Sequence, residues 1–383
     1  MRGRRFAVLA AAVVAVCGPG VSGVFAAGAR SQAPGSFARG GDHVVFVQTD
    51  NLAGNQIVAY RRAGDGSLSP VGSYATGGLG GQLDGSVVDH QASQGSLTYD
   101  AQHGLLYAVN AGSNTISVFS VDGQHLHLTQ VLGSGGSFPV SIAVHGGLVY
   151  VLNALDGGSL QGYVVLADHL LPLPGSKRQL GLDASATPQF VNTPGQVAFS
   201  PSGSQLIVTT KANGNDIDVF RVGFLGLLSL SPVVNSEPGT VPFAIEFDRS
   251  GNLVIAEAGT NALASYSLAP NGTVSLLDRV ATNQSATCWV TGVDGFFYTG
   301  NAGSGSESGF LAGPGGQLTL LGATPTDPGT VDASATPDGR FLYVQAGGPG
   351  NVDAFRIKPD GSLASLGSVT VPGAAGGEGI VAL

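Results

Sequence analysis

Short runs of apolar and β-branched residues, separated by turn-forming residues, recur along the chain at a period of about 45 residues. One unit is complete between residues 95 and 132, where four runs cover 96–99, 105–109, 115–120 and 126–132. Apolar and polar residues that alternate with period two are typical of half-buried β-strands. Asp122-Gly123, between the third and fourth runs, supplies the positive φ of a tight hairpin. The stretch therefore predicts a four-stranded antiparallel sheet.

Two columns of residues repeat in seven such units. An apolar or aromatic residue marks the second strand of each unit, and an aromatic residue twelve to fourteen positions later marks the third strand. The second-strand markers are Phe46, Tyr107, Tyr150, Ile207, Val254, Tyr298 and Tyr343, and the third-strand aromatics are Tyr60, Phe119, Tyr163, Phe220, Tyr266, Phe310 and Phe355. This period and the nearly constant hairpin length are typical of a β-propeller.

A first strand precedes the second strand in only six of the seven units. The remaining apolar run with this pattern lies at 378–383. We expect this C-terminal strand to join the unit of residues 44–74 and close the ring, which removes the sheet edges that promote aggregation. The sequence thus predicts an all-β fold, a seven-bladed β-propeller of four-stranded antiparallel blades.

The first residues follow a different pattern. Three arginines precede an apolar run at 6–16, and small residues follow at 27–29, which are the three parts of a secretory signal peptide. The apolar run is too short for a transmembrane helix. We therefore expect a secreted protein without an integral membrane segment in its mature chain, divided into a signal peptide at 1–29, a flexible leader at 30–42 and the propeller at 43–383.

Charge and cysteine content narrow the kinds of partner and of stabilisation. Removing three arginines with the signal peptide leaves 13 of the 16 basic residues against 25 acidic ones, a net charge of −12. Such a chain has no electrostatic footprint for nucleic acid or for an anionic membrane surface. The mature chain keeps Cys288 alone, so packing and ring closure must stabilise it without an internal disulfide. Cys17 leaves lipoprotein anchoring as an alternative to free secretion, and we expect a monomer.

Two connections between units, 74–94 and 174–194, are longer than the rest. Both run from a fourth strand to the next first strand, on the face that also carries the hairpins between second and third strands, and long loops of this kind are often functional. His90 lies in the first connection, near Asp84 and Asp89. A histidine flanked by carboxylates acts as a general base or a metal ligand. The other interpretation is an exposed loop histidine beside solvating acids, since no metal-ligand spacing is present.

A polar column follows the second-strand markers by three positions, and its members include Asn110, Asn153, Glu257 and Asn301. Strand direction brings the column to the same face, where it is expected to form a ring around the channel mouth. Lys211 follows another member of the column directly, and Asp332 and Glu378 begin the innermost strands of two neighbouring blades. The alternative interpretation is that the amides close turns and the acids pair across blades.

The blade motifs are specific enough to indicate a family. The segments 93–97 (SQGSL), 107–119 (YAVNAGSNTISVF), 194–203 (PGQVAFSPSG) and 338–344 (DGRFLYV) resemble those of the seven-bladed lactonase family, which includes 6-phosphogluconolactonase-type enzymes and fungal carboxymuconate cyclases. The resemblance covers essentially all of residues 43–383 and implies lactone ring opening or closing at the channel mouth without a metal. No serine-hydrolase elbow, Walker loop, Cys-x-x-Cys pair or His-Glu-x-x-His motif is present, so no metal and no cofactor are expected.

Lactone hydrolysis needs a base to activate water and donors to stabilise the developing oxyanion. Glu257 or Glu378 is expected to act as the base, with His90 as an alternative. The expected substrate contacts are Lys211, Asn110, Asn153, Asn301, Asp332 and Arg178. A phosphorylated lactone calls for clustered arginine or lysine, and only Lys177, Arg178 and Lys211 are candidates, so a neutral or externally supplied lactone is expected.

Two functions remain open on the sequence. The first is a secreted, lactonase-like enzyme that hydrolyses a small lactone at the channel mouth. The second is a non-catalytic exported scaffold for binding or adhesion, which presents its loops to a cell-surface glycan or protein. The fold alone does not decide between them. They are separated by whether Glu257, Lys211 and His90 share one concave pocket.

Overall fold

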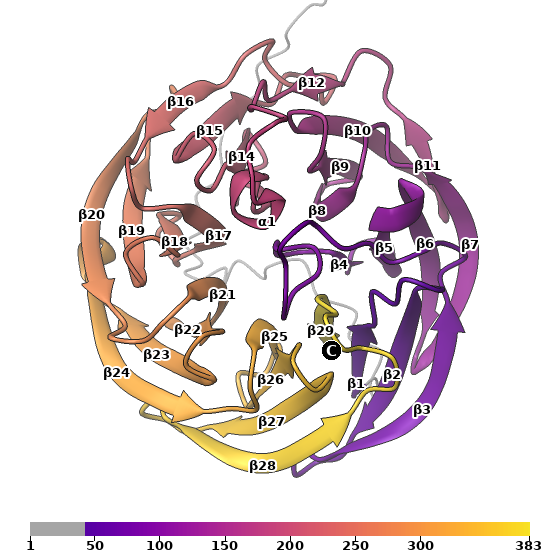
Figure 1. The fold of residues 1–383 in the computed structure, drawn as a ribbon, viewed down its shortest axis with the longest axis vertical. Coiled ribbons are helices and arrows are strands. Elements are labelled where there is room, and N and C mark those ends of the chain that lie inside the picture. Colours follow the sequence, from indigo (N-terminus) through magenta and orange to yellow (C-terminus); the bar gives the residue numbers. More distant parts are fainter. Residues whose placement is uncertain (1–42) are drawn as a thin grey trace, which may run out of the picture. The chain divides into compact units, whose positions relative to one another are not determined.

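The structure, a computed structural model, describes residues 43–383, which form seven sheets arranged around a central axis (Figure 1). The expected signal peptide at 1–29 and leader at 30–42 lie outside the described residues. We number the blades 1 to 7 in chain order. Their strands are given below from the innermost to the outermost.

Blade 1 consists of β29 (Ile380–Ala382), β1 (Val44–Gln48), β2 (Gln56–Arg62) and β3 (Leu68–Ala75). Blade 2 consists of β4 (Leu97–Asp100), β5 (Leu105–Asn110), β6 (Thr115–Asp122) and β7 (His125–Gly133). Blade 3 consists of β8 (Pro139–His145), β9 (Leu148–Asn153), β10 (Ser159–Leu166) and β11 (His169–Pro172), with a fifth strand, β12 (Arg178–Gln179), that also pairs with β10. Blade 4 consists of β13 (Val197–Phe199), β14 (Gln205–Thr209), β15 (Asp216–Arg221) and β16 (Val233–Ser236).

Blade 5 consists of β17 (Pro242–Phe247), β18 (Leu253–Glu257), β19 (Ala262–Leu268) and β20 (Val274–Ala281). Blade 6 consists of β21 (Thr287–Val293), β22 (Phe296–Asn301), β23 (Ser306–Ala312) and β24 (Leu318–Pro325). Blade 7 consists of β25 (Thr330–Ala335), β26 (Phe341–Ala346), β27 (Asn351–Ile357) and β28 (Leu363–Thr370). The helical elements in the described residues are α1 (Gln189–Asn192) and the 3₁₀ turns η1 (Ala111–Ser113) and η2 (Pro314–Gly316).

The ring closes as the sequence predicts. β29 pairs antiparallel with β1, with Val45 opposite Ala382 and Val47 opposite Ile380. The backbone N–H of Leu383 donates to the carbonyl of Val44 at 2.8 Å. Blade 1 is therefore built from both ends of the propeller, and the predicted seven-bladed fold is confirmed.

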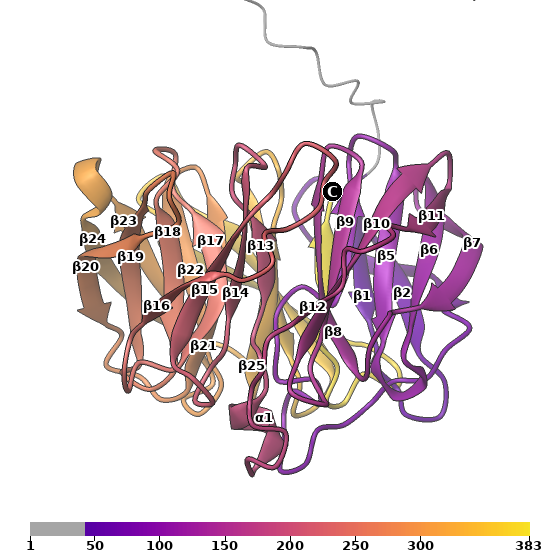
Figure 2. The ribbon, with the colours of Figure 1, turned by 90° about the horizontal axis from the view of Figure 1, so that it is seen from above.

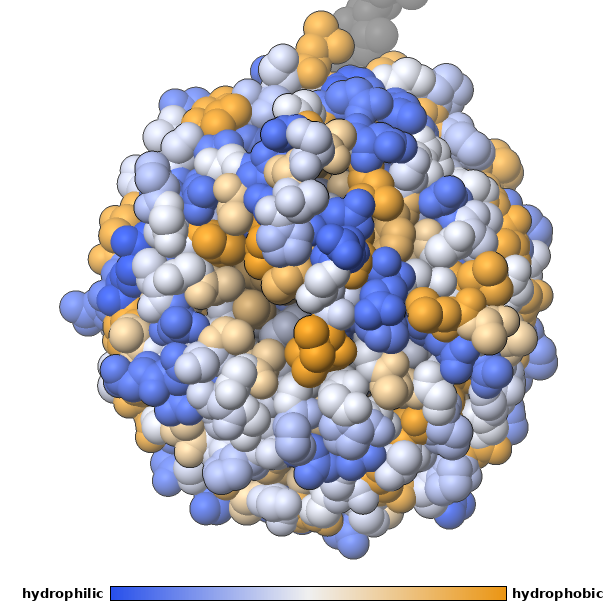
Figure 3. Space-filling model, in the orientation of Figure 1, coloured by the Kyte–Doolittle hydropathy of each residue, from blue (hydrophilic) through white to orange (hydrophobic). Residues whose placement is uncertain are grey.

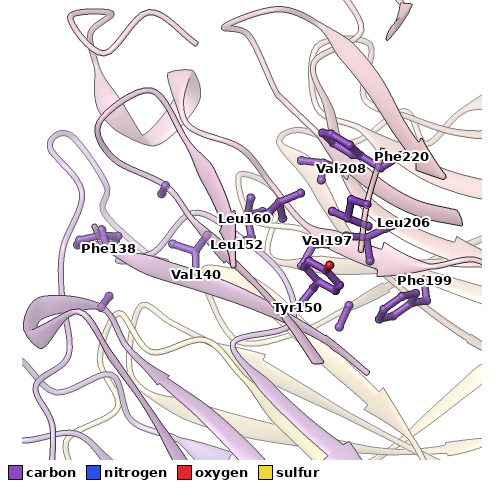
Figure 4. Close-up of a cluster of buried hydrophobic side chains, with 14 of the residues drawn as sticks. Phe138, Val140, Tyr150, Leu152, Leu160, Val197, Phe199, Leu206, Val208 and Phe220 are labelled. Atoms are coloured by element: carbon purple, nitrogen blue, oxygen red, sulfur yellow. The ribbon is translucent and has the colours of Figure 1, made fainter. Parts of the chain in front are cut away.

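The hydrophobic core lies between blades rather than at one centre. In Figure 4, Tyr150, Leu152 and Leu160 of blade 3 face Val197 and Leu206 of blade 4 in one buried cluster. Comparable clusters join other pairs of neighbours around the ring. Each blade therefore buries its apolar faces only when both neighbours are present.

The second-strand tyrosines also link neighbouring blades by hydrogen bonds. The hydroxyl of Tyr298 in blade 6 donates to the carbonyl of Gly361 in blade 7 at 3.0 Å, and Tyr343 in blade 7 reaches Gly66 in blade 1 at 2.8 Å. Gly361 has φ +80°, and a Cβ there would lie 2.5 Å from the ring of Phe296. The glycine after the third strand is thus required for the close approach of two blades as well as for the turn.

The long connections and the second-to-third-strand hairpins lie on one face, which we call the loop face. Backbone hydrogen bonds join the two kinds of segment there. The N–H of Gly80 in the first long connection donates to the carbonyl of Asn51 at 2.9 Å, and the N–H of Ala212 donates to the carbonyl of Val191 in the second at 3.0 Å. Figure 2 shows α1 projecting from this face. The expected positions of the long connections are confirmed.

Candidate functional site

The connection between β3 and β4 crosses the centre of the loop face (Figure 1). Its last residues precede blade 2, yet they bind blade 6 on the far side of the ring. The Gln94 side-chain amide donates to the carbonyl of Val290 at 2.7 Å and accepts from its N–H at 2.9 Å. The indole N–H of Trp289 donates to the carbonyl of Ser93 at 2.7 Å. This crossing segment narrows the mouth of the central channel, and a hollow remains near the centre of this face in Figure 3.

Lys211 holds both long connections in place. Its buried Nζ donates to the carbonyls of Ala92 and Phe190 at 2.6 and 2.7 Å, and to the hydroxyl of Thr193 at 3.1 Å. Nζ also lies 5.3 Å from the centre of the Phe243 ring. Burial lowers the pKa of Lys211 to about 7. All three donors of the ammonium group are therefore engaged by the protein itself.

Three buried carboxyl groups gather under the crossing segment. They are Asp89 in the segment, Asp332 on β25 and Glu378 just before β29. Glu378 Oε1 accepts from the N–H groups of Gly95 and Ser96 at 3.0 and 3.4 Å, and Oε2 has no hydrogen-bond partner among the described residues. The carboxylate of Asp89 instead accepts from backbone N–H groups of its own connection at 2.8 and 3.0 Å.

Burial raises the pKa values of these three groups, and for Asp332 and Glu378 the charges of neighbouring acids add to the effect. Burial raises the pKa of Asp89 to about 6. It raises the pKa of Asp332 to about 7, and the charge of Asp89 acts in the same direction. The pKa of Glu378 lies well above its usual value because the group is buried beside Asp332 and Asp89. Acids with pKa values near neutrality are able both to accept and to donate protons at pH 7.

Glu246 on β17 is a fourth acid of this group. Its side chain keeps part of its surface accessible although protein atoms surround it, as expected of a group on the wall of a narrow channel. Burial raises the pKa of Glu246 to about 7, the N–H groups of Phe247 and Gly292 oppose this, and the charge of Asp332 adds to it. Cys288 is also partly exposed, and burial raises its pKa to about 12, so it is no thiolate near neutral pH.

Polar side chains on or next to the innermost strands also tie neighbouring blades together. Gln196 accepts from the N–H of Ile245 in blade 5 at 2.5 Å, and Ser141 accepts from the N–H of Val197 in blade 4 at 3.2 Å. Glu378 makes the same kind of link toward blade 2. The acids at the axis therefore occupy positions that also hold the ring together.

Glu257 lies within blade 5. It is fully buried at the end of β18, where its carboxylate contacts Arg279 of β20 at 2.6 and 2.9 Å and the hydroxyl of Thr260 at 2.8 Å. Tyr266 also donates to it. Both carboxylate oxygens are thus engaged by other residues of the protein. The structure does not bring Glu257 together with Lys211 and His90 in one pocket.

The three asparagines of the polar column lie inside their blades. Asn110 donates to the hydroxyl of Ser117 at 2.8 Å, Asn301 donates to Ser308 at 2.9 Å, and Asn153 donates to the carbonyl of Ser134 at 3.2 Å. All three side chains are fully buried. They close hairpins and hold neighbouring segments at the ends of the second strands.

Arg178 and His90 lie at different places on the molecule. Arg178, on β12, makes four hydrogen bonds to backbone carbonyls, at 2.5–2.9 Å. His90 is half-buried at the crossing segment, where its backbone N–H donates to the carbonyl of Gly376 at 2.8 Å. Burial lowers the pKa of His90, and its Nδ1 has no partner within residues 43–383. The imidazole is therefore neutral at pH 7, next to Asp89 in the chain.

Among the residues named from the sequence, the structure thus brings Asp332 and Glu378 together, with Asp89 linking them to Lys211. The sequence analysis assigned no role to Asp89 or Glu246. The signal for Glu246 is a single acid in the otherwise apolar innermost strand PFAIEF. In the part of the chain that the structure describes, no cluster of three or more His, Cys, Asp or Glu side chains is arranged to hold a metal ion.

The comparison with solved structures found proteins of the same architecture that align with this chain over almost all of their own length. The periplasmic gluconolactonase of Pseudomonas aeruginosa is 18% identical over 88% of this chain and 98% of its own, with a TM-score of 0.70. A candidate 6-phosphogluconolactonase of Bacteroides fragilis is 16% identical over 91% of this chain and 99% of its own, with a TM-score of 0.69. The expected resemblance is therefore confirmed at the level of the fold.

The same fold also carries a different chemistry. Virginiamycin B lyase of Staphylococcus aureus is 14% identical over 78% of this chain and 90% of its own, with a TM-score of 0.54. No protein-family model and no curated protein sequence matches the chain. Identities this low show the fold, so the reaction has to be argued from the side chains. Within residues 43–383, none of the helices has the length and apolar character needed to cross a bilayer.

Proposed function

We propose that this protein hydrolyses a small, neutral lactone inside its central channel, below the mouth at the loop face. The observation that carries the proposal is the group of acids at the axis, in which Asp332 and Glu246 both have a pKa raised to about 7. Asp332 also raises the pKa of Glu246 by its charge, and two such acids that titrate near neutrality are suited to general acid–base catalysis. The lactonases among the solved structures with this architecture support the choice of a lactone.

In the proposed reaction, one of the two carboxyl groups is ionised and the other is protonated. The carboxylate takes a proton from water as the water oxygen attacks the lactone carbonyl. The carbonyl–ring oxygen bond then breaks, and the carboxylic acid gives its proton to the departing ring oxygen. The product is an open-chain hydroxy acid, and the two groups end in exchanged protonation states. Proton exchange with solvent restores them.

The other members of the cluster tune and shape this site. The charge of Asp89 raises the pKa of Asp332, so Asp89 keeps the acid form of its neighbour populated. His90 and Glu378 lie at the crossing segment, where they position the mouth and exchange protons with the reacting pair. Lys211 acts through the two connections that it holds.

The choice of a neutral lactone follows from the basic residues. A phosphate group needs cationic donors that are not already engaged. Lys211 directs all three of its donors to protein atoms, and Arg178 makes four hydrogen bonds to backbone carbonyls. The acids at the axis also repel a phosphate dianion. We further propose that the protein acts outside the cytoplasm, on the signal-peptide pattern of residues 1–29.

The proposal is tested by proton release from residues 30–383 against a panel of aldono-, homoserine and muconate-type lactones, with phosphorylated lactones alongside. Asp332→Asn and Glu246→Gln should each abolish turnover while the melting temperature is retained, because each replaces a group already protonated at mildly acidic pH by a neutral isostere. Asp122→Asn, an exposed acid in the β6–β7 hairpin, is the matched control and should keep full turnover. Turnover that survives both channel variants contradicts the assignment.

The binding scaffold is the second candidate, and two observations favour it. Glu257, Lys211 and His90 do not share a pocket, and the crossing segment narrows access to the acids. If no lactone is turned over above the buffer rate, the scaffold replaces the enzyme. Retained binding of a glycan or a surface protein after Asp332→Asn is then expected, since binding would use the loop face and not the acids beneath it.

A further inference from the structure

The connection between β15 and β16 in blade 4 presents an apolar surface to solvent. Residues 222–235 (VGFLGLLSLSPVVN) contain no charged side chain. Phe224 is fully exposed and Leu230 is 88% exposed. Leu225, Val233 and Val234 add exposed fractions of 68%, 40% and 55%. We call these five side chains the blade-4 patch. Apolar side chains stand out at the rim in Figure 3, where Figure 1 places β12 and β16.

The exposed segment is held firmly by its own blade and by blade 3. Gly223 donates to the carbonyl of Leu227 at 2.8 Å, which forms a tight turn with Phe224 at its tip. Tyr150 of blade 3 donates to the carbonyl of Gly226 at 2.7 Å, and Arg178 donates to that of Leu228 at 2.5 Å. The apolar side chains are therefore presented by a fixed backbone, which lowers the entropy cost of burying them against a partner.

A hollow lies beside the patch on the same rim. Its volume is about 260 Å³, and its walls include Val219, Arg221, Ser231 and Val233 of blade 4 and Pro270 of blade 5. A protruding apolar group next to a hollow on one surface is the arrangement that a two-fold symmetric dimer uses, because each copy offers what the other needs.

The area of the patch matches what a stable dimer requires. At about 170 Å² for each free side chain, the exposed fractions of the five residues amount to about 600 Å² per copy. Two copies would thus bury about 1,200 Å², the lower end of the range for specific protein–protein interfaces. A patch of about 600 Å² is at the upper end of the range for the largest apolar patch of a typical monomer, and such patches are often functional.

Charge favours a second copy at this place. A mature chain with a net charge of −12 repels its own copies over most of its surface. The blade-4 patch lacks acids, and Arg221 is exposed at its edge, so repulsion is weakest here. β16 is also an outermost strand whose four residues, VVNS, carry no charge that would discourage edge-to-edge pairing.

We propose that two copies of this chain associate through the blade-4 patches about a two-fold axis, with the Phe224 turn of each copy seated in the hollow of the other. This inference is independent of the proposed lactone hydrolysis. The monomer expected from the sequence analysis remains untested, and this patch is the observation against it.

Sedimentation velocity on residues 30–383, from about 1 to about 100 μM, tests the proposal. The unaltered chain should sediment as a dimer. The double variant Phe224→Ser/Leu230→Ser should contain a larger fraction of monomer at each concentration, with at least about a tenfold higher dissociation constant. At a protein concentration low enough for both proteins to be monomeric, the melting temperature of this variant should equal that of the unaltered chain, because both side chains are exposed.

Leu276→Ser/Leu277→Ser on β20 of blade 5 is the matched control, since these leucines are 46% and 42% exposed on an outermost strand outside the patch. The control should remain dimeric. A monomer at all concentrations, or equal dissociation of the control, overturns the proposal, as does an open polymer in place of a dimer.

Discussion

Replacing Glu257 by glutamine separates a structural role from a chemical one. The carboxylate is fully buried, Arg279 contacts it at 2.6 and 2.9 Å, and Thr260 donates to it at 2.8 Å. Glutamine keeps the volume, but it removes the negative charge and directs an NH₂ group toward either the guanidinium or the hydroxyl groups. Arg279 then loses its buried counter-ion.

The size of the effect follows from the exposure of the arginine. Removing one partner of a buried ion pair costs about 3–5 kcal/mol. Arg279 is 29% exposed and lies 3.1 Å from Glu237, so water and this second carboxylate recover part of the loss. We therefore expect a loss of about 2–3 kcal/mol in the free energy of unfolding. At about 2.1 cal/mol/K of unfolding entropy per residue, the melting temperature should fall by about 3–4 °C.

Calorimetry on Glu257→Gln, Arg279→Gln and the double variant measures this interaction. The double variant should lose less than the sum of the single variants, with a coupling energy of at least about 1 kcal/mol. Turnover of any lactone substrate, measured per folded molecule at a temperature well below melting, should be unchanged in Glu257→Gln. A variant that melts like the unaltered protein but has lost turnover would refute the ion-pair interpretation and make Glu257 the base.

Three further predictions concern the axis and the turns. Burial raises the pKa of Asp332 from 3.8 to about 7, so between these pH values the folded state holds a proton that the unfolded state has released. The melting temperature should therefore fall as pH rises from about 4 to about 7. Asp332→Asn should make the melting temperature less dependent on pH in this range. Gln94→Ala should speed amide hydrogen exchange in the connection between β3 and β4, while exchange in the outer strands stays unchanged. Gly361→Ala should lower the melting temperature by about 4 °C through its φ of +80° and a clash with Phe296, whereas Gly54→Ala, with nothing within 4 Å, should not.

The repeat pattern was sufficient to predict the blades because each blade is made almost entirely from residues close together in sequence. Strand order, hairpin length and the third-strand aromatics all follow from local periodicity. Closure by β29 was also predictable. Only six of the seven units are preceded by a first strand, and the apolar run at 378–383 supplies the seventh. The path of the crossing segment was not, because the contact between Gln94 and Val290 joins residues 196 positions apart and leaves no local pattern.

The candidate site was predicted less well for a geometric reason. The polar column of Asn110, Asn153, Glu257 and Asn301 does reach the loop-face ends of the second strands. A second strand, however, is separated from the axis by the innermost strand, so its side chains lie between blades. Asp332 and Glu378 were found because Asp332 lies on an innermost strand and Glu378 lies just before one. Glu246 shares that property and was identifiable as the one acid in an apolar strand.

Ring closure has a consequence for the order in which the protein is made. β1 and β2 are synthesised about 330 residues before β29, which pairs with β1 in blade 1. Until β29 arrives, β1 keeps an open strand edge, and the incomplete ring exposes the apolar faces of its two terminal blades. Sequence-distant pairing of this kind delays folding and leaves unpaired edges exposed. The edge of β1 is therefore covered only after β29 has been synthesised. The interval between the synthesis of these two strands is the period in which aggregation is most favoured.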